Sequence, residues 1–294
     1  MRGAEATPVD RPPAARAGVG GAEGPAWRRG PIIMPSPRFP SLQRPRNVQT
    51  GLLALLAVSV LGTSFLSGVF GMAGGMVLMG VLIAVVPVST AMVLHGTAQM
   101  TSNGWRALLW RRNIDFSIFF RYVAGLLVAG LLFSFIGFVP DRALVLLTLG
   151  VIPFLAVLIP AKFVPQATSR FGSEACGFLN TSMQFIAGVS GPLLDVFFVR
   201  SDMDRRSVVA TKAACQTVSH FAKLIYFTRM ASTSGEVEAI VMGMAVFMAI
   251  AGTSLSKFVL ERLTDTQFRR WTQGLVMIIG VVYLTQGVYV LLAD

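Results

Sequence analysis

Two stretches of the sequence carry polar residues of matching type at matching spacing inside otherwise apolar runs. Both sets follow the spacing i, i+4, i+7, i+11, namely His95, Gln99, Ser102 and Arg106, then Lys212, Gln216, Ser219 and Lys223. This spacing places each set on one face of a helix. Because lysine and arginine supply positive charge and amides donate hydrogen bonds, the pattern predicts a surface that binds an anion.

A glycine-rich interruption precedes each polar set. It reads GVFGMAGG from residue 68 and GVSGP from residue 188, and it supplies the candidate site glycines Gly71, Gly74, Gly188 and Gly191. Glycine and proline are unfavourable inside helices, so each interruption predicts a broken helix. A half-helix that restarts after a break presents free N–H groups, which bind anions. The alternative is close helix packing through small residues, which two copies of the interruption make the weaker interpretation.

The composition identifies the environment of these helices. Of the 294 residues, 54% are hydrophobic and 13% are charged, against about 25% charged residues in a typical soluble domain. Two cysteines exclude a disulfide scaffold, and the apolar content excludes a disordered chain. We therefore predict an all-α polytopic membrane protein. The net charge of +11 is then assigned to loops and membrane edges, and no nucleic-acid partner is predicted.

The apolar runs organise the chain. Residues 1–47 are rich in Pro, Gly and Arg and predict a disordered tail. About eight transmembrane segments follow, at 51–70 with a continuation at 75–87, then at 90–110, 117–139, 142–160, 174–200, 207–228, 237–256 and 270–292. Arginines at 38, 44 and 46 favour a cytoplasmic N-terminus. Eight simple crossings would place the arginines near residues 200–206 outside, so either a segment is re-entrant or the two halves are inverted.

An offset of 117 residues relates the two halves of the chain. It places Gly71 on Gly188, Gln99 on Gln216, and His95 on Lys212. We predict a first transmembrane repeat at 48–163, a linker at 164–172 and a second repeat at 173–294. Such repeats are typical of secondary transporters, whose binding site lies at the repeat interface near the middle of the membrane. Chance alignment of glycine-rich sequence is the alternative.

Lys212 is the strongest single signal, because it is the sixth residue of the segment 207–228 and a charge inside a membrane is costly. Its alternatives are an ion pair with Asp195 or extension of the side chain to the membrane edge. Asp195 is itself a candidate for carrying a coupled proton, or a simple counter-ion. Arg106 and Lys223 lie near the ends of their segments, where an anchoring role is expected.

Three sequence stretches resemble the TauE/SafE family of sulfite exporter-like permeases. They are the glycine run from residue 68 to 75, the stretch from Ala91 through His95 to Ala98, and the second glycine run from Ala187 to Pro192. The resemblance covers roughly residues 50–292. It implies duplicated four-helix units and transport of small anions such as sulfite and organosulfonates.

The sequence therefore predicts a secondary permease for a small anion in the bacterial cytoplasmic membrane. The predicted substrate-binding residues are Gly71, Gly74, His95, Gln99, Gly188, Gly191, Lys212, Gln216 and Ser219. The anion and the lipid bilayer are the expected partners, homo-oligomerisation is left open, and no cofactor or metal is predicted. A rhomboid-like intramembrane protease using Ser190 and His220 is one alternative, because GVSG matches its GxSG signature. A non-transporting membrane assembly factor is the other.

Overall fold

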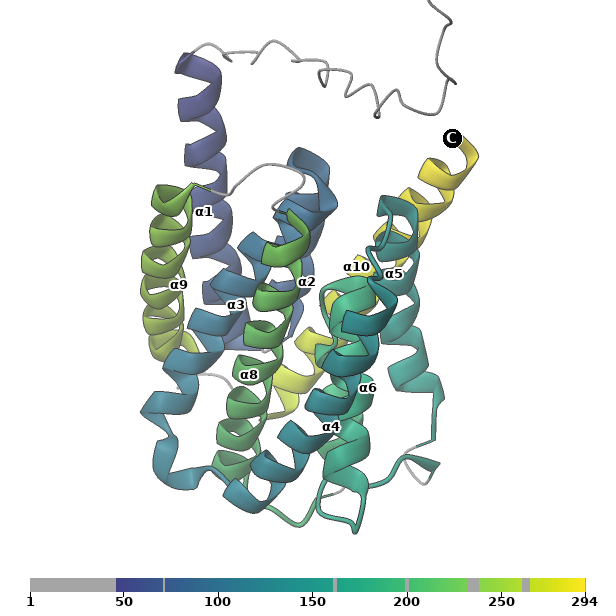
Figure 1. The fold of residues 1–294 in the computed structure, drawn as a ribbon. Helices are drawn as coiled ribbons and strands as arrows, with labels where there is room; N and C mark the ends of the chain where they lie inside the picture. The colour runs from purple at the N-terminus through teal and green to yellow at the C-terminus, as the bar shows by residue number, and fades with distance from the viewer. Residues whose placement is uncertain are drawn as a thin grey trace, which may run out of the picture. The chain divides into compact units, whose positions relative to one another are not determined.

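A computed structural model describes residues 46–70, 72–160, 163–198, 201–231, 238–260 and 265–293. This part of the chain is helical and contains no strand, which confirms the predicted fold class. The helices (Figure 1) are α1 Arg46–Phe70, α2 Ala73–Val85, α3 Val88–Leu109, η2 Arg111–Asn113, α4 Phe116–Ile136, α5 Arg142–Leu158, α6 Gly172–Ala187, α7 Gly191–Phe198, α8 Arg205–Ala231, α9 Ala239–Leu260 and α10 Asp265–Ala293. The predicted tail, except for its last two residues, and Gly71 lie outside the described residues.

Four of the described helices are long and apolar enough to cross a membrane, at Thr50–Phe70, Phe116–Ile136, Ala239–Val259 and Trp271–Ala293. Two shorter apolar helices are Ala73–Val85 and Arg142–Leu158. A span needs about 20 residues. α3 and α8 reach that length but carry the polar sets that lower their hydropathy. The prediction of about eight spans stays a prediction.

Local sequence signals set several helix ends. Asp115 and Asp141 each accept a hydrogen bond from a backbone N–H three residues later, at 3.1 and 2.7 Å, and so begin α4 and α5. Asp204 begins α8 in the same way, and the hydroxyl and N–H of Ser207 hold the pKa of that carboxyl below its usual value. Gly137 ends α4 in the left-handed conformation, with a φ of 64° that glycine adopts without strain.

α1 and α2 form the first hairpin. The Cα of Gly74 lies so close to α1 that an added Cβ would be 2.1 Å from the Thr63 carbonyl oxygen and 2.4 Å from the Ser67 amide. Thr63 and Ser67 lie about one to two turns before the end of α1 at Phe70. Because Gly74 of α2 contacts these earlier residues, the chain reverses direction at the break. Pro87 then precedes α3, so α3 starts at the open end of this hairpin.

α6 and α7 form the second hairpin. α6 ends at Gly188, which has a φ of 76°, and α7 restarts at Gly191. The Ala167 amide, before α6, donates to the Phe197 carbonyl near the end of α7 at 2.8 Å. The outer ends of α6 and α7 therefore lie together, and α8 starts at the open end of this hairpin.

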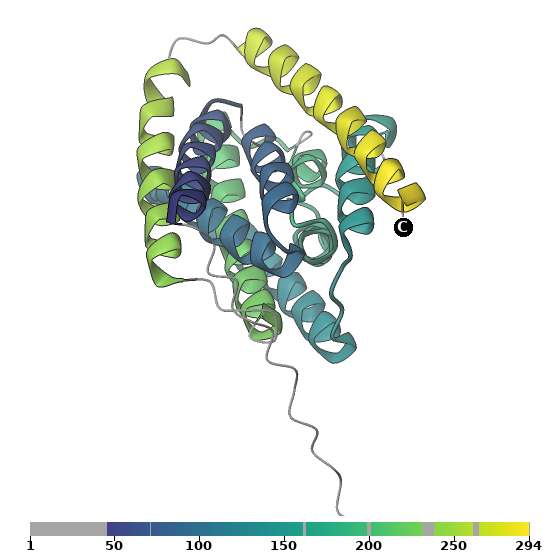
Figure 2. The same ribbon diagram turned by 90° about the horizontal axis from the view of Figure 1, so that it is seen from above.

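α3 and α8 pack against each other in opposite directions. Gly96 lies against Lys223, and Gly104 further along α3 lies against Thr217, earlier on α8. Because each of these helices starts at the open end of its own hairpin, the two hairpins open toward opposite ends of the helix bundle. Around this pair, α1 packs along α9, α4 along α6, and α5 along α10 (Figure 2).

Candidate functional site

The tips of the two hairpins meet at a small cavity. An added Cβ on Gly191 of the second hairpin would lie 2.4 Å from the Cβ of Met72, beside the break of the first. The cavity beside this contact is lined by Met72, Gly75, His95, Gln99, Val189, Ser190, Gly191, Gln216 and His220. Its volume is about 10 Å³, which is close to the smallest space that holds one water molecule. The two glycine interruptions and the two polar sets thus converge on one place.

Two helix N-termini face this cavity. Gly75 lies in the first turn of α2, and Ser190 and Gly191 lie at the start of α7. The first N–H groups of a helix have no partner within the helix, and they carry the positive end of its dipole. The cavity lining contains no carboxylate. Its electrostatic character therefore favours an anion.

Three buried polar atoms on the cavity wall have no hydrogen-bond partner. They are Gln99 Nε2, Ser190 Oγ and His220 Nδ1. Gln99, Ser190 and His220 are each less than 5% exposed. A buried polar atom left unpaired costs about 1–3 kcal/mol. Three such atoms around one cavity can form hydrogen bonds with a polar ligand.

A buried lysine lies directly behind the cavity wall. Lys223 is 0% exposed, and its Nζ donates to the carbonyl of Gly188 and to His95 Nδ1, both at 2.8 Å. His95 Nδ1 therefore accepts, so the ring proton is on Nε2, which donates to the Gly75 carbonyl at 2.9 Å. The bond to Gly188 places the Lys223 amine at the C-terminal end of α6, where the helix dipole would favour its charged form.

The predicted site residues divide into two groups. His95, Gln99, Gly191 and Gln216 line the cavity, and the carbonyl of Gly188 is bound by Lys223 behind it. Gly74 holds α2 against α1.

The other predicted residues lie away from the cavity. Lys212 forms an ion pair with Asp195, the alternative interpretation of its charge, and their side chains are 26% and 37% exposed. Ser219 lies in a separate buried network, 2.5 Å from the hydroxyl of Tyr122, which also accepts from Asn180.

Lys223 is the candidate site residue that the sequence interpretation undervalued. Its position near the end of the segment 207–228 predicts an anchor at the membrane edge, but α8 continues to Ala231 and the lysine is fully buried. The neighbouring residues in the sequence indicated its burial, because Phe221-Ala222 precede the lysine and Leu224-Ile225 follow it. A lysine bordered by apolar residues on both sides has no short route to water.

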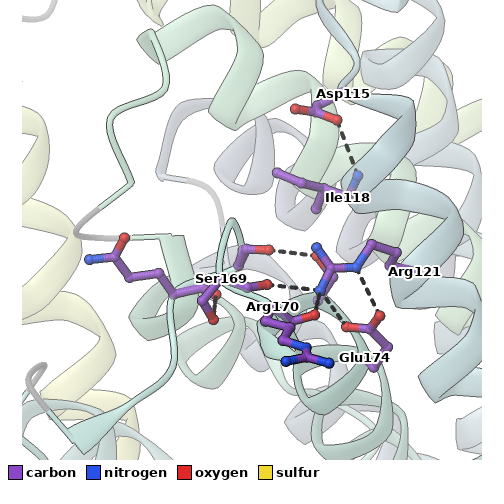
Figure 3. A network of polar contacts seen from close by, with 9 residues as sticks. Asp115, Ile118, Arg121, Ser169, Arg170 and Glu174 are labelled. Atoms are coloured by element: carbon purple, nitrogen blue, oxygen red, sulfur yellow. Dashed lines mark hydrogen bonds and ion pairs between the residues drawn. The ribbon is translucent and has the colours of Figure 1, made fainter.

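A half-buried ion pair ties the second hairpin to α4. The Arg121 guanidinium binds Glu174 through Nε and Nη2, both at 2.8 Å, and its Nη2 also donates to the Ser169 carbonyl (Figure 3). The backbone of Arg170 accepts from the same nitrogen. Such bidentate pairs are geometrically specific. The network holds the start of α6 beside α4 and so fixes the base of the hairpin that carries Gly188. Within the described residues no group of three His, Cys, Asp or Glu could hold a metal ion.

Long apolar helices around two broken hairpins, with a polar cavity at the hairpin tips, are features of an integral membrane protein of the transporter class. The model of the sulfite exporter TauE/SafE family matches residues 55–283, which is more than half of the chain. The protein therefore belongs to the sulfite exporter TauE/SafE family, whose members are membrane transporters. No curated protein and no solved structure gives a significant match.

Proposed function

We propose that the protein is a secondary permease that binds a small oxyanion, sulfite or an organosulfonate, between the two hairpin tips. The observation that carries this proposal is the set of three unpaired buried atoms, on Gln99, Ser190 and His220, around a cavity without a carboxylate. An oxyanion would accept hydrogen bonds from the amide, the hydroxyl and the imidazole. It would also neutralise the positive ends of α2 and α7.

The two halves act in this proposal as inverted repeats. The predicted offset of 117 residues carries the end of α1, Phe70, onto the end of α6, Ala187, and the start of α3, Val88, onto the start of α8, Arg205. The antiparallel packing of α3 against α8 supports a two-fold axis in the membrane plane between the halves. In this proposal the cavity lies at the repeat interface.

The small volume of the cavity implies a moving part. A space of about 10 Å³ suits one water molecule and is too small for a four-atom oxyanion. The hairpin tips must separate for the anion to enter, and Met72 against Gly191 is the contact that would open. Rocking of one repeat against the other would expose the site to each side in turn.

The charges suggest an orientation in a bacterial cytoplasmic membrane. The end of the bundle where α3 ends and α8 begins carries Arg111, Arg112, Arg170 and Arg206. The opposite end carries Arg142 and Arg229, so the first end would be cytoplasmic. Because α1 and α2 form a hairpin, the start of α1 then lies on the other side. This orientation departs from the cytoplasmic N-terminus that the arginines before α1 favour.

The test is anion flux in proteoliposomes that contain the purified protein. We expect sulfite or a short sulfonate to move and acetate and chloride to move less, because three converging donors suit a compact oxyanion. Gln99→Leu should reduce this flux. Gln286→Leu, on the exposed face of α10, is the matched control and should not. Equal flux of all anions, or equal loss in both variants, would contradict the proposed site.

The two residues of the protease alternative both lie at the cavity, but no hydrogen bond between them is seen in the described part of the chain. Ser190 and His220 both line the cavity, but no hydrogen bond connects the serine Oγ to the His220 ring in the described part of the chain, and both side chains hold an unpaired atom. A nucleophilic serine needs a base within hydrogen-bonding reach. The transporter proposal uses the same two atoms as donors to an anion.

A further inference from the structure

The hydrogen bonds of Lys223 leave one position on its nitrogen unused. A charged lysine has three N–H donors, whereas a neutral amine has two. Lys223 has two acceptors, His95 Nδ1 and the Gly188 carbonyl. The observed bonds thus use both N–H groups of the neutral amine, and its lone pair is left to accept a proton. A third N–H, on the charged form, has no acceptor among the described residues.

The surroundings of Lys223 also lack a compensating negative charge. The titratable groups that face one another here are His95 from α3 and His220 and Lys223 from α8. α2 and α6 contribute the backbone carbonyls of Gly75 and Gly188. No carboxylate in the described part of the chain faces these three side chains. A buried charge without a partner is strongly unfavourable, so positive charge here depends on an anion that comes from outside.

The two histidines connect this lysine to the cavity. The ring centroids of His95 and His220 are 5.5 Å apart, and both rings line the cavity wall. His220 Nδ1 is buried and unpaired. His95 is bonded to the lysine on one side and to Gly75 on the other. A proton therefore has acceptor atoms both at the cavity and behind it.

We propose that His95, His220 and Lys223, the buried His–Lys cluster, take up one proton when an anion enters the cavity and release it when the anion leaves. The proton comes from water on the side of entry and returns to water on the side of exit, and no bond to the anion forms or breaks. The anion supplies the negative charge that the cluster lacks, so anion and proton cross the membrane in the same direction. This inference rests on the proposed permease function.

The test measures protons moved per sulfite in proteoliposomes that contain a trapped pH-sensitive dye. Bisulfite carries a proton of its own, so the decisive quantity is the difference between the wild type and variants. We expect Lys223→Met and His220→Gln to move one proton fewer per sulfite than the wild type. Lys257→Met, an exposed lysine on α9, is the control and should match the wild type. Sulfite–sulfite exchange, which needs no net proton movement, should persist in Lys223→Met, because Lys223 does not line the cavity.

The possible results separate this inference from the proposed function. Equal proton movement per sulfite in the wild type and in a folded cluster variant would overturn the coupling. Loss of exchange in folded Lys223→Met would overturn it as well, because Lys223 would then be needed for anion binding itself. Absence of sulfite flux in the wild type would instead contradict the permease function itself. If Lys223→Met does not fold, His220→Gln, which keeps a polar side chain on the cavity wall, decides the question.

Discussion

The polar sets of α3 and α8 make equivalent contacts in the two halves of the molecule. The first residue of each set binds the second helix of its own hairpin, in the pairs His95–Gly75 and Lys212–Asp195. The second position, Gln99 or Gln216, lines the cavity. The third bonds a helix of the other half, in the pairs Ser102–Thr253 and Ser219–Tyr122. The fourth binds a carbonyl at the end of the first hairpin helix, in the pairs Arg106–Ser67 and Lys223–Gly188.

The two ends of the bundle differ in burial, although their contacts match. His95 and Lys223 lie toward one end, are 0% exposed and bond to each other. Their counterparts under the 117-residue offset, Lys212 and Arg106, lie toward the other end. Arg106 is half-buried, and Lys212 is paired with a carboxylate that is 37% exposed. One end of the structure is thus sealed around a histidine and a lysine, and the other reaches the surface.

The two ends also differ in how their positive charges are compensated. At the surface-reaching end Asp195 supplies the negative charge that a cation needs. At the sealed end no such group faces Lys223 in the described residues. In an inverted-repeat transporter the two ends exchange roles during the cycle. We infer that the structure is the state in which the proposed cytoplasmic end is the more accessible one.

The largest expected effect is an all-or-none difference in thiol labelling. Under the offset, Asp195 corresponds to Leu78, which is 0% exposed. With both native cysteines replaced, Asp195→Cys should react with a membrane-impermeant thiol reagent, and Leu78→Cys should not. Mass spectrometry of the intact protein reads out both. Equal labelling of the two positions would remove the asymmetry on which the comparison rests.

Gly74→Ala should lower the stability of the first hairpin. The new Cβ would meet the backbone of Thr63 and Ser67 at 2.1 and 2.4 Å. Rigid overpacking of this kind costs about 1–3 kcal/mol, occasionally more. Gly243→Ala on α9 is the control, because nothing lies within 4 Å of its new Cβ. Thermal unfolding in detergent should show a lower midpoint for the first variant and an unchanged or higher one for the second.

Gln99→Leu should change stability and binding in opposite directions. Its Nε2 is buried and unpaired, so the apolar side chain removes a desolvation penalty and should raise the free energy of unfolding. The same change should weaken sulfite binding by about 1–3 kcal/mol, because the anion loses a buried donor.

Gln216→Leu, at the half-buried counterpart, tests whether the amides share one ligand. It should weaken binding less than Gln99→Leu, and the double variant should be non-additive if both contact the same anion. Sulfite titration by calorimetry gives the affinities. Additive losses would show that the two amides act at separate places.

Periodicity and glycine spacing were sufficient to predict much of this arrangement. Helical geometry fixes which residues of each polar set share a face, and one amide from each set, Gln99 or Gln216, lines the cavity. The glycine runs predicted both helix breaks, between α1 and α2 and between α6 and α7, because glycine is costly inside a helix.

Burial and hairpin direction could not be predicted in the same way. Lys212 was predicted to be the more deeply buried lysine because Lys223 lies near the end of the predicted segment 207–228. α8 extends past that end to Ala231, so the distance to a predicted segment end is a poor measure of burial. The reversal of the chain at Gly74 depends on tertiary contact with Thr63 and Ser67, which no local pattern encodes. The pairing of Lys212 with Asp195 was one of two open interpretations for the same reason.

The smallest expected effect comes from Ser190→Ala, which also decides between the transporter and the protease. Under the offset, Ser190 corresponds to Ala73, so the first hairpin already makes its break without a hydroxyl. The Ser190 hydroxyl has no partner in the described chain. Its loss should therefore leave folding intact and remove one neutral hydrogen bond to the anion, worth about 0.5–1.5 kcal/mol. Sulfite affinity should fall about tenfold at most, with transport retained.

A serine protease that lost its nucleophile would lose about six orders of magnitude in rate. Cleavage of a model transmembrane substrate by the wild type, absent in Ser190→Ala, would replace the transporter function with the enzyme, whereas a modest change in sulfite affinity alone makes the serine one donor among several.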